Sequence, residues 1–326
     1  MKLAVAGVGT IAQEVLPQAA EWGWEVSALC ATPRSRELLT RLAGEYGAAA
    51  YEDFTAMLEE ADMDAVYIAV PNHLHFTFAS QALARGRHVI LEKPMAAGAA
   101  EAARLAELAG EKDLFLFEAI STLYLPGYER TRQWLPRIGP IKLASCNFSQ
   151  YSRRYDAFRA GTVLPAFDPA KCGGALMDLG VYNLHYLVGL FGAPERAVYH
   201  ANVERGIDTS GVAVLTYDGF QAVSAAAKDC AAPSGCLIQG ARGYIQTEGA
   251  ANCGGKVSLR LSDGTEETFT PPPGSRLEPE FRRFAREIAS GSREACRAML
   301  DHSLRVSEAL TRARLSAGVR FPGDPV

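Results

Sequence analysis

The sequence has no apolar run long enough to cross a membrane and no large excess of either charge. Its 33 basic and 37 acidic residues give a formal net charge of −4. It therefore has no basic surface of the kind that binds nucleic acid or anionic lipid. Because a membrane span needs about 18–20 apolar residues, we expect neither a membrane-spanning segment nor a nucleic-acid partner. Gly7 and Gly9 interrupt the apolar start of the chain, which argues against a signal peptide.

Cysteine is present but unorganised. The seven cysteines are odd in number, are scattered, and form no C-x-x-C pair. This argues against a disulfide framework and against a cysteine-based zinc site, so we predict no metal and a reducing, cytoplasmic compartment. With 326 residues, the chain can bury a substantial core without such cross-links, and its length suggests two domains.

The first 119 residues alternate short apolar strands with longer helical patterns. Helices are predicted at 11–22, 37–46, 53–61, 77–85 and 99–109. Strands are predicted at 2–6, 25–30, 48–51, 64–70, 88–91 and 114–117. Such alternation is typical of βαβ units in a parallel sheet, and we predict an α/β domain over 1–119.

After residue 118 the pattern changes to strands without crossover helices. Helices are predicted at 127–135, 175–190, 278–290 and 293–317. Strands are predicted at 141–148, 197–202, 211–217, 221–228, 237–239, 244–247 and 257–261. Turn dipeptides such as Asp218-Gly219 separate several of these strands, which favours an open, largely antiparallel sheet. We therefore predict an α+β domain over 120–326.

A glycine-rich turn follows the first predicted strand. Gly7, Gly9 and Ala12 form a GxGxxA pattern, with Thr10 and Ile11 between them. In a dinucleotide-binding Rossmann domain, the first glycine makes the turn and the second admits the pyrophosphate. The small third residue packs the helix on the strand. The alternative is an ordinary glycine turn, but its place between a first strand and a first helix favours the dinucleotide.

The end of the second strand bears on cofactor preference. NAD-binding domains usually place an acidic residue there for the ribose hydroxyl. Here Thr32, Arg34 and Arg36 occur instead, and no carboxylate appears before Glu37. Because a guanidinium suits a 2′-phosphate, we predict NADP, with NAD as the alternative. The alternative for the arginines is that they are solvated residues of a helix start.

Two polar segments follow parallel strands, where open α/β sheets bind ligands. The first contains Pro71, Asn72 and His75, and the second is Glu92-Lys93-Pro94. A partly desolvated Lys93 could polarise a carbonyl or take a proton from an alcohol. The alternative for Glu92-Lys93-Pro94 is a surface turn.

The second domain contains the segment GGALMDLGVYNLH. If it is an α-helix, Asp178, Tyr182 and His185 lie at i, i+4 and i+7 on one face. A helical face that carries a carboxylate, a phenol and an imidazole is better suited to bind a polyol than to pack in a hydrophobic core. Tyr182 could donate a proton to a carbonyl oxygen, while Asp178 could bind a substrate hydroxyl or orient Lys93. The alternatives are a core-edge Tyr182 and a structural His185.

Together these motifs resemble the glucose–fructose oxidoreductase/inositol dehydrogenase/MocA (Gfo/Idh/MocA) family over essentially the whole chain. The matching elements are the GxGxxA turn, PNHLH, LEKP, GGALMDLGVY and the final GVRFPGD. Within the family, LFEAISTLYLP and ALMDLGVYNL are most similar to the dihydrodiol dehydrogenase and NADP-dependent D-xylose dehydrogenase branch. FSQYSRRYDAF is similar to a poorly characterised bacterial branch.

The resemblance implies roles for residues that match the family's motifs. Lys93 would be the catalytic lysine, and Asp178 the aspartate of the D-x-G-x-[HY] motif, with Tyr182 where many relatives have histidine. It also implies cofactor contacts for residues at the turn, at the second strand's end and in the two polar segments. These are Gly7, Gly9, Thr10, Ile11, Ala12, Thr32, Arg34, Pro71, Asn72, His75, Glu92 and Lys93.

The substrate is expected to contact Lys93, Asp178, Tyr182, His185 and Tyr151. Tyr151 begins the segment Tyr151-Ser152-Arg153-Arg154-Tyr155, whose arginines suit an acidic sugar; the alternative is a solvated loop or a subunit contact. The open sheet needs a partner for its uncovered face, and in this family that face usually mediates dimerisation, so we predict a homodimer.

The leading hypothesis is an NADP-linked oxidoreductase acting on a secondary alcohol or hemiacetal of a sugar, polyol or cyclic diol. Because the cofactor residues precede 120 and Asp178 and Tyr182 follow it, we expect the active site between the two domains. One rival is a redox-neutral sugar isomerase or glycosidase-like enzyme with tightly bound NAD. The other is a dinucleotide-sensing regulator without activity.

Overall fold

The computed structural model describes residues 1–324, which divide into two compact units. The first unit consists of Met1–Ala119 and Leu277–Leu304, and the second of Ile120–Arg276 and the described residues from Arg305 onward. The chain first passes from the first unit to the second between Ala119 and Ile120, which is the position of the predicted boundary. The predicted second domain differs from the second unit, because the chain returns to the first unit at Leu277.

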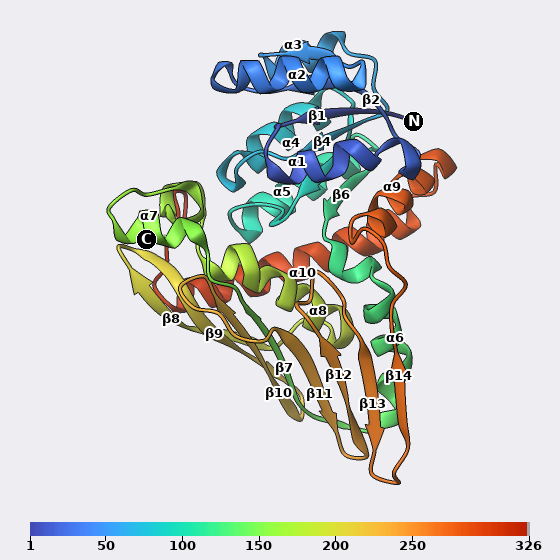
Figure 1. The fold of residues 1–326 in the computed structure, drawn as a ribbon, viewed down its shortest axis with the longest axis vertical. Coiled ribbons are helices and arrows are strands. Elements are labelled where there is room, and N and C mark those ends of the chain that lie inside the picture. Colours follow the sequence, from blue (N-terminus) through green and yellow to red (C-terminus); the bar gives the residue numbers. More distant parts are fainter. Residues whose placement is uncertain (325–326) are drawn as a thin grey trace. The chain divides into compact units, whose positions relative to one another are not determined.

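The sheet of the first unit is parallel throughout the pairs that the structure describes. Its order, β3-β2-β1-β4-β5-β6, reverses direction between β1 and β4, which is the topological switch point where such sheets bind ligands (Figure 1). The predicted Rossmann-type sheet is therefore confirmed. The strands are β1 (Lys2–Ala6), β2 (Glu25–Cys30), β3 (Ala49–Tyr51), β4 (Ala65–Ile68), β5 (His88–Glu92) and β6 (Leu116–Ala119).

Helices connect these strands, and the first helix is shorter than predicted. It ends at Val15 and two 3₁₀ turns, Leu16–Gln18 and Ala20–Trp22, follow. Pro17 explains the break, since a proline offers no backbone N–H to continue an α-helix. The helices of the first unit are α1 (Thr10–Val15), α2 (Arg36–Tyr46), α3 (Phe54–Glu60), α4 (His75–Ala84), α5 (Ala99–Glu111) and α9 (Glu278–Ser290), with 3₁₀ turns at Pro33–Ser35 and Asn72–Leu74.

Helix α9 joins the first unit through two buried aromatic side chains, Phe281 and Phe284. The ring of Phe281 lies 5.1 Å from that of Tyr67, and its carbonyl accepts a hydrogen bond from the Trp24 indole at 3.0 Å. Phe284 stacks on Phe117 at 4.7 Å. Because burying each phenylalanine contributes about 1.5–3 kcal/mol, these contacts explain why a segment so late in the sequence belongs here.

The second unit contains a larger, mixed sheet in the order β14-β13-β12-β11-β7-β10-β9-β8. The β7–β10 pair is parallel and the other pairs are antiparallel, which confirms the predicted largely antiparallel sheet. A strand at 266–269 was not predicted, since Glu266–Phe269 is mostly polar. The strands are β7 (Ile141–Ser149), β8 (Arg196–Glu204), β9 (Ile207–Tyr217), β10 (Phe220–Ala227), β11 (Gly235–Gly240), β12 (Gly243–Glu248), β13 (Val257–Leu261) and β14 (Glu266–Phe269).

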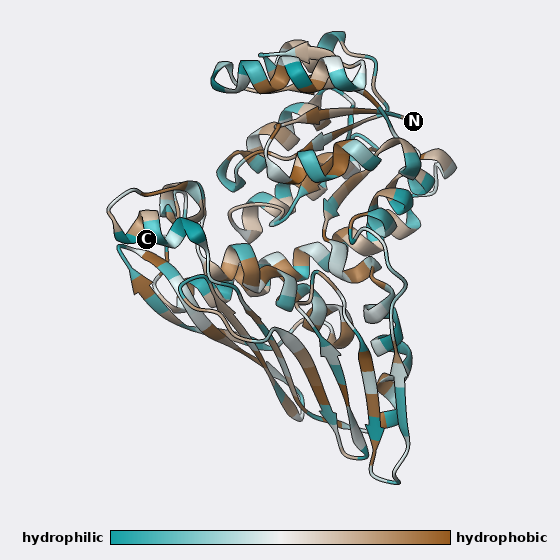
Figure 2. Cartoon of the chain, in the orientation of Figure 1, coloured by the Kyte–Doolittle hydropathy of each residue, from teal (hydrophilic) through white to brown (hydrophobic). Residues whose placement is uncertain are grey.

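Helices α6 (Pro126–Trp134) and α8 (Val181–Phe191) contact the same sheet. Along β7, Ala144, Cys146 and Phe148 are buried, while Ser145 and Asn147 between them are more exposed. Figure 2 shows this alternation of apolar and polar residues along the strands of the second unit. One face of the sheet therefore forms the core with the helices, and the other is open in the single chain.

Two local differences from the sequence prediction concern the site. Residues expected to form a polar loop include helix α7 (Arg153–Arg159), which begins where the Ser152 hydroxyl accepts a hydrogen bond from the Arg154 N–H. The predicted helix 175–190 begins as a π-helix, Leu176–Gly180, before α8. The remaining 3₁₀ turns are Ser121–Tyr124, Leu135–Ile138, Pro165–Phe167 and Pro169–Lys171.

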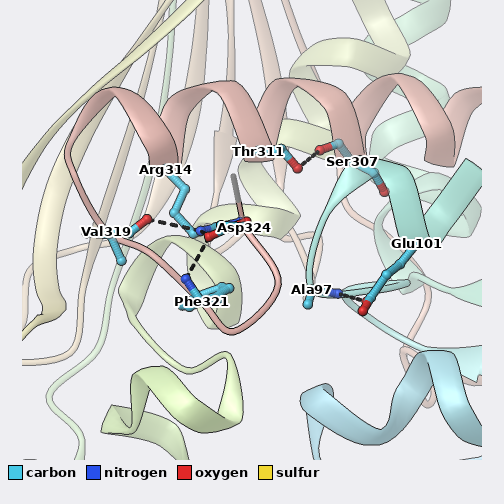
Figure 3. A network of polar contacts seen from close by, with 8 residues as sticks. All are labelled: Ala97, Glu101, Ser307, Thr311, Arg314, Val319, Phe321 and Asp324. Atoms are coloured by element: carbon cyan, nitrogen blue, oxygen red, sulfur yellow. Dashed lines mark hydrogen bonds and ion pairs between the residues drawn. The ribbon is translucent and has the colours of Figure 1, made fainter. Parts of the chain in front are cut away.

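The last helix, α10 (Glu294–Ser316), is divided between the units at Leu304 and Arg305. Near its end, the buried guanidinium of Arg314 donates to the Val319 carbonyl and to both carboxylate oxygens of Asp324 (Figure 3). Asp324 also accepts from the Phe321 N–H at 2.6 Å. This arrangement explains the closing GVRFPGD motif, since its aspartate closes the loop back onto the helix.

Candidate active site

The glycine-rich turn lies between β1 and α1. Gly7 has a φ of +102°, and a Cβ there would lie 2.3 Å from the carbonyl oxygen of Ala69, beyond the end of β4. Its N–H donates to the Cys30 carbonyl at 2.8 Å. A glycine is therefore required at position 7 for two reasons: the positive φ of the turn, and the close approach of the backbone at Ala69.

Gly9, in contrast to Gly7, has open space around its Cα. A Cβ built on Gly9 meets no atom within 4 Å, and both Gly9 and Thr10 are exposed. Ile11 is half-buried and Ala12 is wholly buried, as expected for a small residue that packs α1 on the sheet. The open side at Gly9 and the first amides of α1 fit the approach of a pyrophosphate to the main chain.

The end of β2 carries a charge arrangement that the sequence did not reveal. Thr32 is exposed and precedes the 3₁₀ turn Pro33–Ser35, and Arg34 is also exposed. Arg36 forms a two-pronged ion pair with Glu52, with an Nη2–Oε2 distance of 2.7 Å. Glu52 follows β3, which lies beside β2, so only the sheet brings it here. Because Glu52 balances Arg36, Arg34 is the better candidate for a 2′-phosphate.

The segment after β4 is braced by His75. Pro71 is exposed and Asn72 is half-buried at the start of a 3₁₀ turn, but His75 is wholly buried. Its Nδ1 lies 2.8 Å from the Pro94 carbonyl and its Nε2 lies 2.9 Å from the Val70 carbonyl. Burial lowers the pKa of His75 against the raising effect of these carbonyls. His75 thus ties two loops together from the interior of the first unit, and its predicted contact with the cofactor stays a prediction.

The turn that carries Lys93 is held by buried carboxylates. Glu92 is 9% exposed and accepts hydrogen bonds from the Tyr67 hydroxyl at 2.6 Å and from the Lys93 N–H at 3.2 Å. The Met95 N–H donates to Glu118 at 2.8 Å. Lys93 itself is half-buried. These hydrogen bonds fix the conformation of the turn, so it is not a freely solvated surface turn. The buried Glu92 carboxylate stabilises it by accepting a hydrogen bond from the Lys93 N–H.

In the second unit, a close approach of two chain segments sets the start of the π-helix. Gly174 has a φ of +105°, and a Cβ there would lie 2.0 Å from Oδ1 of Asp208. Oδ2 of Asp208 accepts hydrogen bonds from the Leu176 N–H at 2.7 Å and the Tyr199 hydroxyl at 2.9 Å. Burial raises the pKa of Asp208 to about 6, against the lowering effect of these bonds. This contact explains the second glycine of GGALMD, and a Cβ on the first, Gly173, would lie 2.6 Å from the Pro165 carbonyl oxygen.

The π-helix changes the predicted helical face. A π-turn contains more residues than an α-turn, so the spacing i, i+4, i+7 no longer defines one column. The Asp178 side chain is 36% exposed, Tyr182 is 8% exposed, and His185 is wholly buried. His185 thus lies inside the second unit, and its predicted substrate contact stays a prediction beside the structural alternative.

Asp178 has a partner that sequence reasoning missed. Its Oδ2 lies 2.8 Å from Nζ of Lys228, a buried lysine directly after β10. A lone lysine at the end of the apolar run QAVSAAA was the only signal in the sequence. The ion pair orients the carboxylate within its own unit, whereas one of the two roles predicted for Asp178 from the sequence is to orient Lys93.

Tyr151 lies next to α7 and is 40% exposed. Its hydroxyl donates to Asp156 at 2.6 Å, and this hydrogen bond raises the pKa of Tyr151. Its ring lies 6.0 Å from that of Tyr155, edge to face. The phenol is thus engaged locally, although its exposure leaves it accessible to a ligand.

Within residues 1–324, no group of three histidine, cysteine, aspartate or glutamate side chains is arranged to hold a metal ion. Across the same residues, no helix combines the length and the apolar character needed to cross a membrane.

Comparison with known proteins identifies the family. The model of the oxidoreductase family with an NAD-binding Rossmann fold, GFO_IDH_MocA, matches residues 1–119, and the GFO/IDH/MocA C-terminal domain matches residues 131–246. The chain belongs to the Gfo/Idh/MocA oxidoreductase family. The family predicted from the motifs is thereby confirmed.

Three members show how far the likeness extends over this Gfo/Idh/MocA chain. It is 33% identical to the NADP-dependent scyllo-inositol 2-dehydrogenase IolU of Bacillus subtilis, over 99% of each chain. It is 30% identical to an NADP-dependent D-xylose 1-dehydrogenase of Haloferax volcanii, over 89% of this chain and 88% of the relative. The 3-ketoreductase KijD10 of Actinomadura kijaniata, solved with NADP and TDP-benzene, is 26% identical, covers 97% of each chain and has a TM-score of 0.85.

Proposed function

We propose that this protein is an NADP-dependent oxidoreductase that interconverts a secondary alcohol or hemiacetal of a sugar, polyol or cyclic diol with the corresponding carbonyl. The observation that carries the proposal is the combination of two features within one chain. One is a phosphate-binding turn with an open side at Gly9, and the other is the braced turn that presents Lys93. The names of the inositol and xylose dehydrogenases support the substrate class and the cofactor.

Each catalytic residue has a distinct chemical task in this proposal. When bound, the nicotinamide supplies or accepts the hydride at the reacting carbon. In reduction, the Tyr182 phenol donates its proton to the carbonyl oxygen, while the Lys93 ammonium stabilises the developing negative charge. Oxidation reverses both transfers. Asp178 accepts a hydrogen bond from a neighbouring hydroxyl of the substrate and so orients it.

The cofactor contacts proposed for this chain follow its accessible groups. Gly9, Thr10 and Ile11 face the pyrophosphate with their main chain, and Arg34 and Thr32 take the 2′-phosphate. Asn72 and Pro71 lie on the loop after β4, where the ribose and nicotinamide of such cofactors bind.

The test is a cofactor-reduction screen with NAD and NADP in parallel against aldoses, inositols and dihydrodiols. We expect turnover with NADP, loss of at least 10³-fold in kcat for Lys93→Ala and about 10²-fold or more for Tyr182→Phe, with NADPH binding nearly unchanged. Full activity in Lys93→Ala would contradict the role of the lysine. Cofactor retained through purification would favour the redox-neutral rival, and binding without turnover across the panel would favour the sensor.

We further propose that the protein is a homodimer joined through the open face of the second sheet. A row of half-exposed side chains crosses five strands there in register: Val198, Val214, Val223, Ser145 and Leu237. Because this row is uncharged, a second copy can cover it without burying an unpaired charge. Light scattering after size-exclusion chromatography is expected to give twice the chain mass. Val223→Glu should give the monomer, whereas Val203→Glu, at an exposed valine outside the row, should not.

The proposed location is the cytoplasm. None of the seven cysteines, all of which lie within residues 1–324, forms a disulfide bond, which suits a reducing compartment. Fractionation of cells that produce the protein, with detection of the untagged chain, tests this location.

A further inference from the structure

Lys228 is a lysine enclosed by the second unit. It directly follows β10 and only 2% of the residue is exposed. Its ammonium donates to Oδ2 of Asp178 at 2.8 Å and to the carbonyl oxygen of Ala166 at 3.0 Å, and it lies 4.7 Å from the ring centre of Phe167. The three contacts leave the cation surrounded by one carboxylate, one carbonyl and one aromatic face.

The backbone of Lys228 is also held in place. Its N–H donates to the Thr209 carbonyl at 2.8 Å, and its carbonyl accepts from the Ser152 N–H at 2.9 Å. Removing an ammonium from water costs several kcal/mol, which only a nearby carboxylate and well-placed acceptors offset. Burying Lys228 therefore carries a large desolvation cost, and hydrogen bonds from both its side chain and its backbone hold it in place.

The two side chains of the Lys228–Asp178 ion pair differ in solvent exposure, which indicates a role other than stabilising the fold. The Lys228 side chain is 3% exposed, whereas that of Asp178 is 36% exposed. In another buried ion pair of this unit, Arg314 with Asp324, both side chains are covered, at 1% and 11%. Asp178 thus has a buried counter-ion on one side and accessible surface on the other, as a ligand-binding carboxylate requires.

We propose that Lys228 is a positioning residue for the reaction: its ammonium pairs with Asp178 and fixes the orientation in which Asp178 accepts a hydrogen bond from a substrate hydroxyl. The inference rests on the proposed role of Asp178. Lys228 acts through Asp178 and does not itself touch the substrate.

The experiment compares Lys228→Met, Lys228→Arg, Asp178→Asn and the double variant Lys228→Met/Asp178→Asn. Steady-state kinetics use NADPH or NADP with scyllo-inositol, D-xylose and the best substrate from the screen. Arg314→Met is the matched control, because it breaks a buried ion pair of the same unit that does not involve Asp178. NADPH binding and thermal unfolding are measured for every variant.

We expect Lys228→Met to lower kcat/KM at least tenfold, mainly through KM, with NADPH affinity within twofold of the wild type. Lys228→Arg should recover part of the loss, since a guanidinium can still donate to the carboxylate. In the Asp178→Asn background, Lys228→Met should change kcat/KM by less than twofold. Arg314→Met should lower the unfolding temperature without raising KM.

Two results would overturn the inference while leaving the proposed function intact. The first is an active wild type with Lys228→Met within twofold of it. The second is an equal loss from Lys228→Met with and without Asp178, which would indicate a purely structural lysine. If Lys228→Met alone does not fold, the double variant, which leaves no unpaired buried charge, is compared with Asp178→Asn by the same criterion. A wild type inactive across the whole panel would instead overturn the proposed function, and the inference with it.

Discussion

Oδ2 of Asp208 accepts a hydrogen bond from the main-chain N–H of Leu176 at 2.7 Å, at the first residue of the π-helix that carries Asp178. This single contact links a strand of the second sheet to the segment proposed to bind the substrate. It also places a carboxyl group where burial opposes its ionisation, since burial raises the pKa of Asp208 to about 6. The start of the π-helix is therefore tied to a group that titrates near neutral pH.

The raised pKa predicts a pH dependence of stability. Between about pH 4 and pH 6 the folded protein binds more protons at Asp208 than the unfolded chain does, so the free energy of unfolding falls as the pH rises. At 1.36 kcal/mol per pKa unit, the loss is on the order of 3 kcal/mol. Urea unfolding of the wild type and Asp208→Asn across this range should show the wild type losing stability relative to the variant. A constant difference would contradict the assignment.

Gly174→Ala should damage both stability and activity. The positive φ alone costs a side chain about 1–2 kcal/mol, and the added Cβ would also collide with Asp208, 2.0 Å away. Gly47→Ala is the matched control, because Gly47 has a φ of +66° but open space around it. We expect the control to lose about 1 kcal/mol and to keep its kcat. Gly174→Ala should unfold at a lower urea concentration than the control and lose activity, because the displaced loop leads into the π-helix.

Arg34→Ala should change the choice of cofactor. Loss of a charged hydrogen bond to a phosphate costs about 1.5–3 kcal/mol, which corresponds to a 10- to 100-fold higher KM for NADP with little change for NAD. Arg36→Ala should have a smaller effect, since Glu52 already balances this arginine. The measurement is the ratio of kcat/KM for the two cofactors. An equal loss of kcat/KM with NAD and with NADP would show that Arg34 does not bind the 2′-phosphate.

Arg314→Met should lower the free energy of unfolding by about 3–5 kcal/mol, because it leaves the covered Asp324 carboxylate without its counter-ion. Arg312→Met, on the same helix but half exposed beside Glu308, should cost less than about 1 kcal/mol. Equal losses in urea unfolding would show that Arg314 contributes no more than a surface ion pair.

The same ion pair predicts a pH effect opposite in sign to that of Asp208. Although burial alone would raise it, the pKa of Asp324 is held below its ordinary value by hydrogen bonds from Arg314 and Phe321 and by the charge of Arg314. A lowered pKa stabilises the fold above about pH 4 and the contribution disappears as the pH falls further. The stability difference between the wild type and Asp324→Asn should therefore shrink in acid.

Most of the fold was predictable because its signals are local. The strand 25–30 and the helix 278–290 were predicted to the residue, since strand and helix periodicities are read within a short window. The first helix was too long in the prediction because Pro17 was not given its helix-breaking effect. The return of α9 to the first unit was not foreseen, because its partners Trp24, Tyr67 and Phe117 lie more than 150 residues away.

The candidate site divides in the same way. The amino-acid sequence alone determined the family and the glycine-rich turn, and it singled out Lys93, Asp178 and Tyr182 as candidate site residues, since these are motifs of fixed spacing. Only the tertiary structure decided which neighbours act on them. It placed His75 and His185 in the interior and added Lys228 to Asp178 and Glu52 to Arg36. Burial and ion pairing depend on residues brought together from distant positions, and no spacing along the chain encodes such encounters.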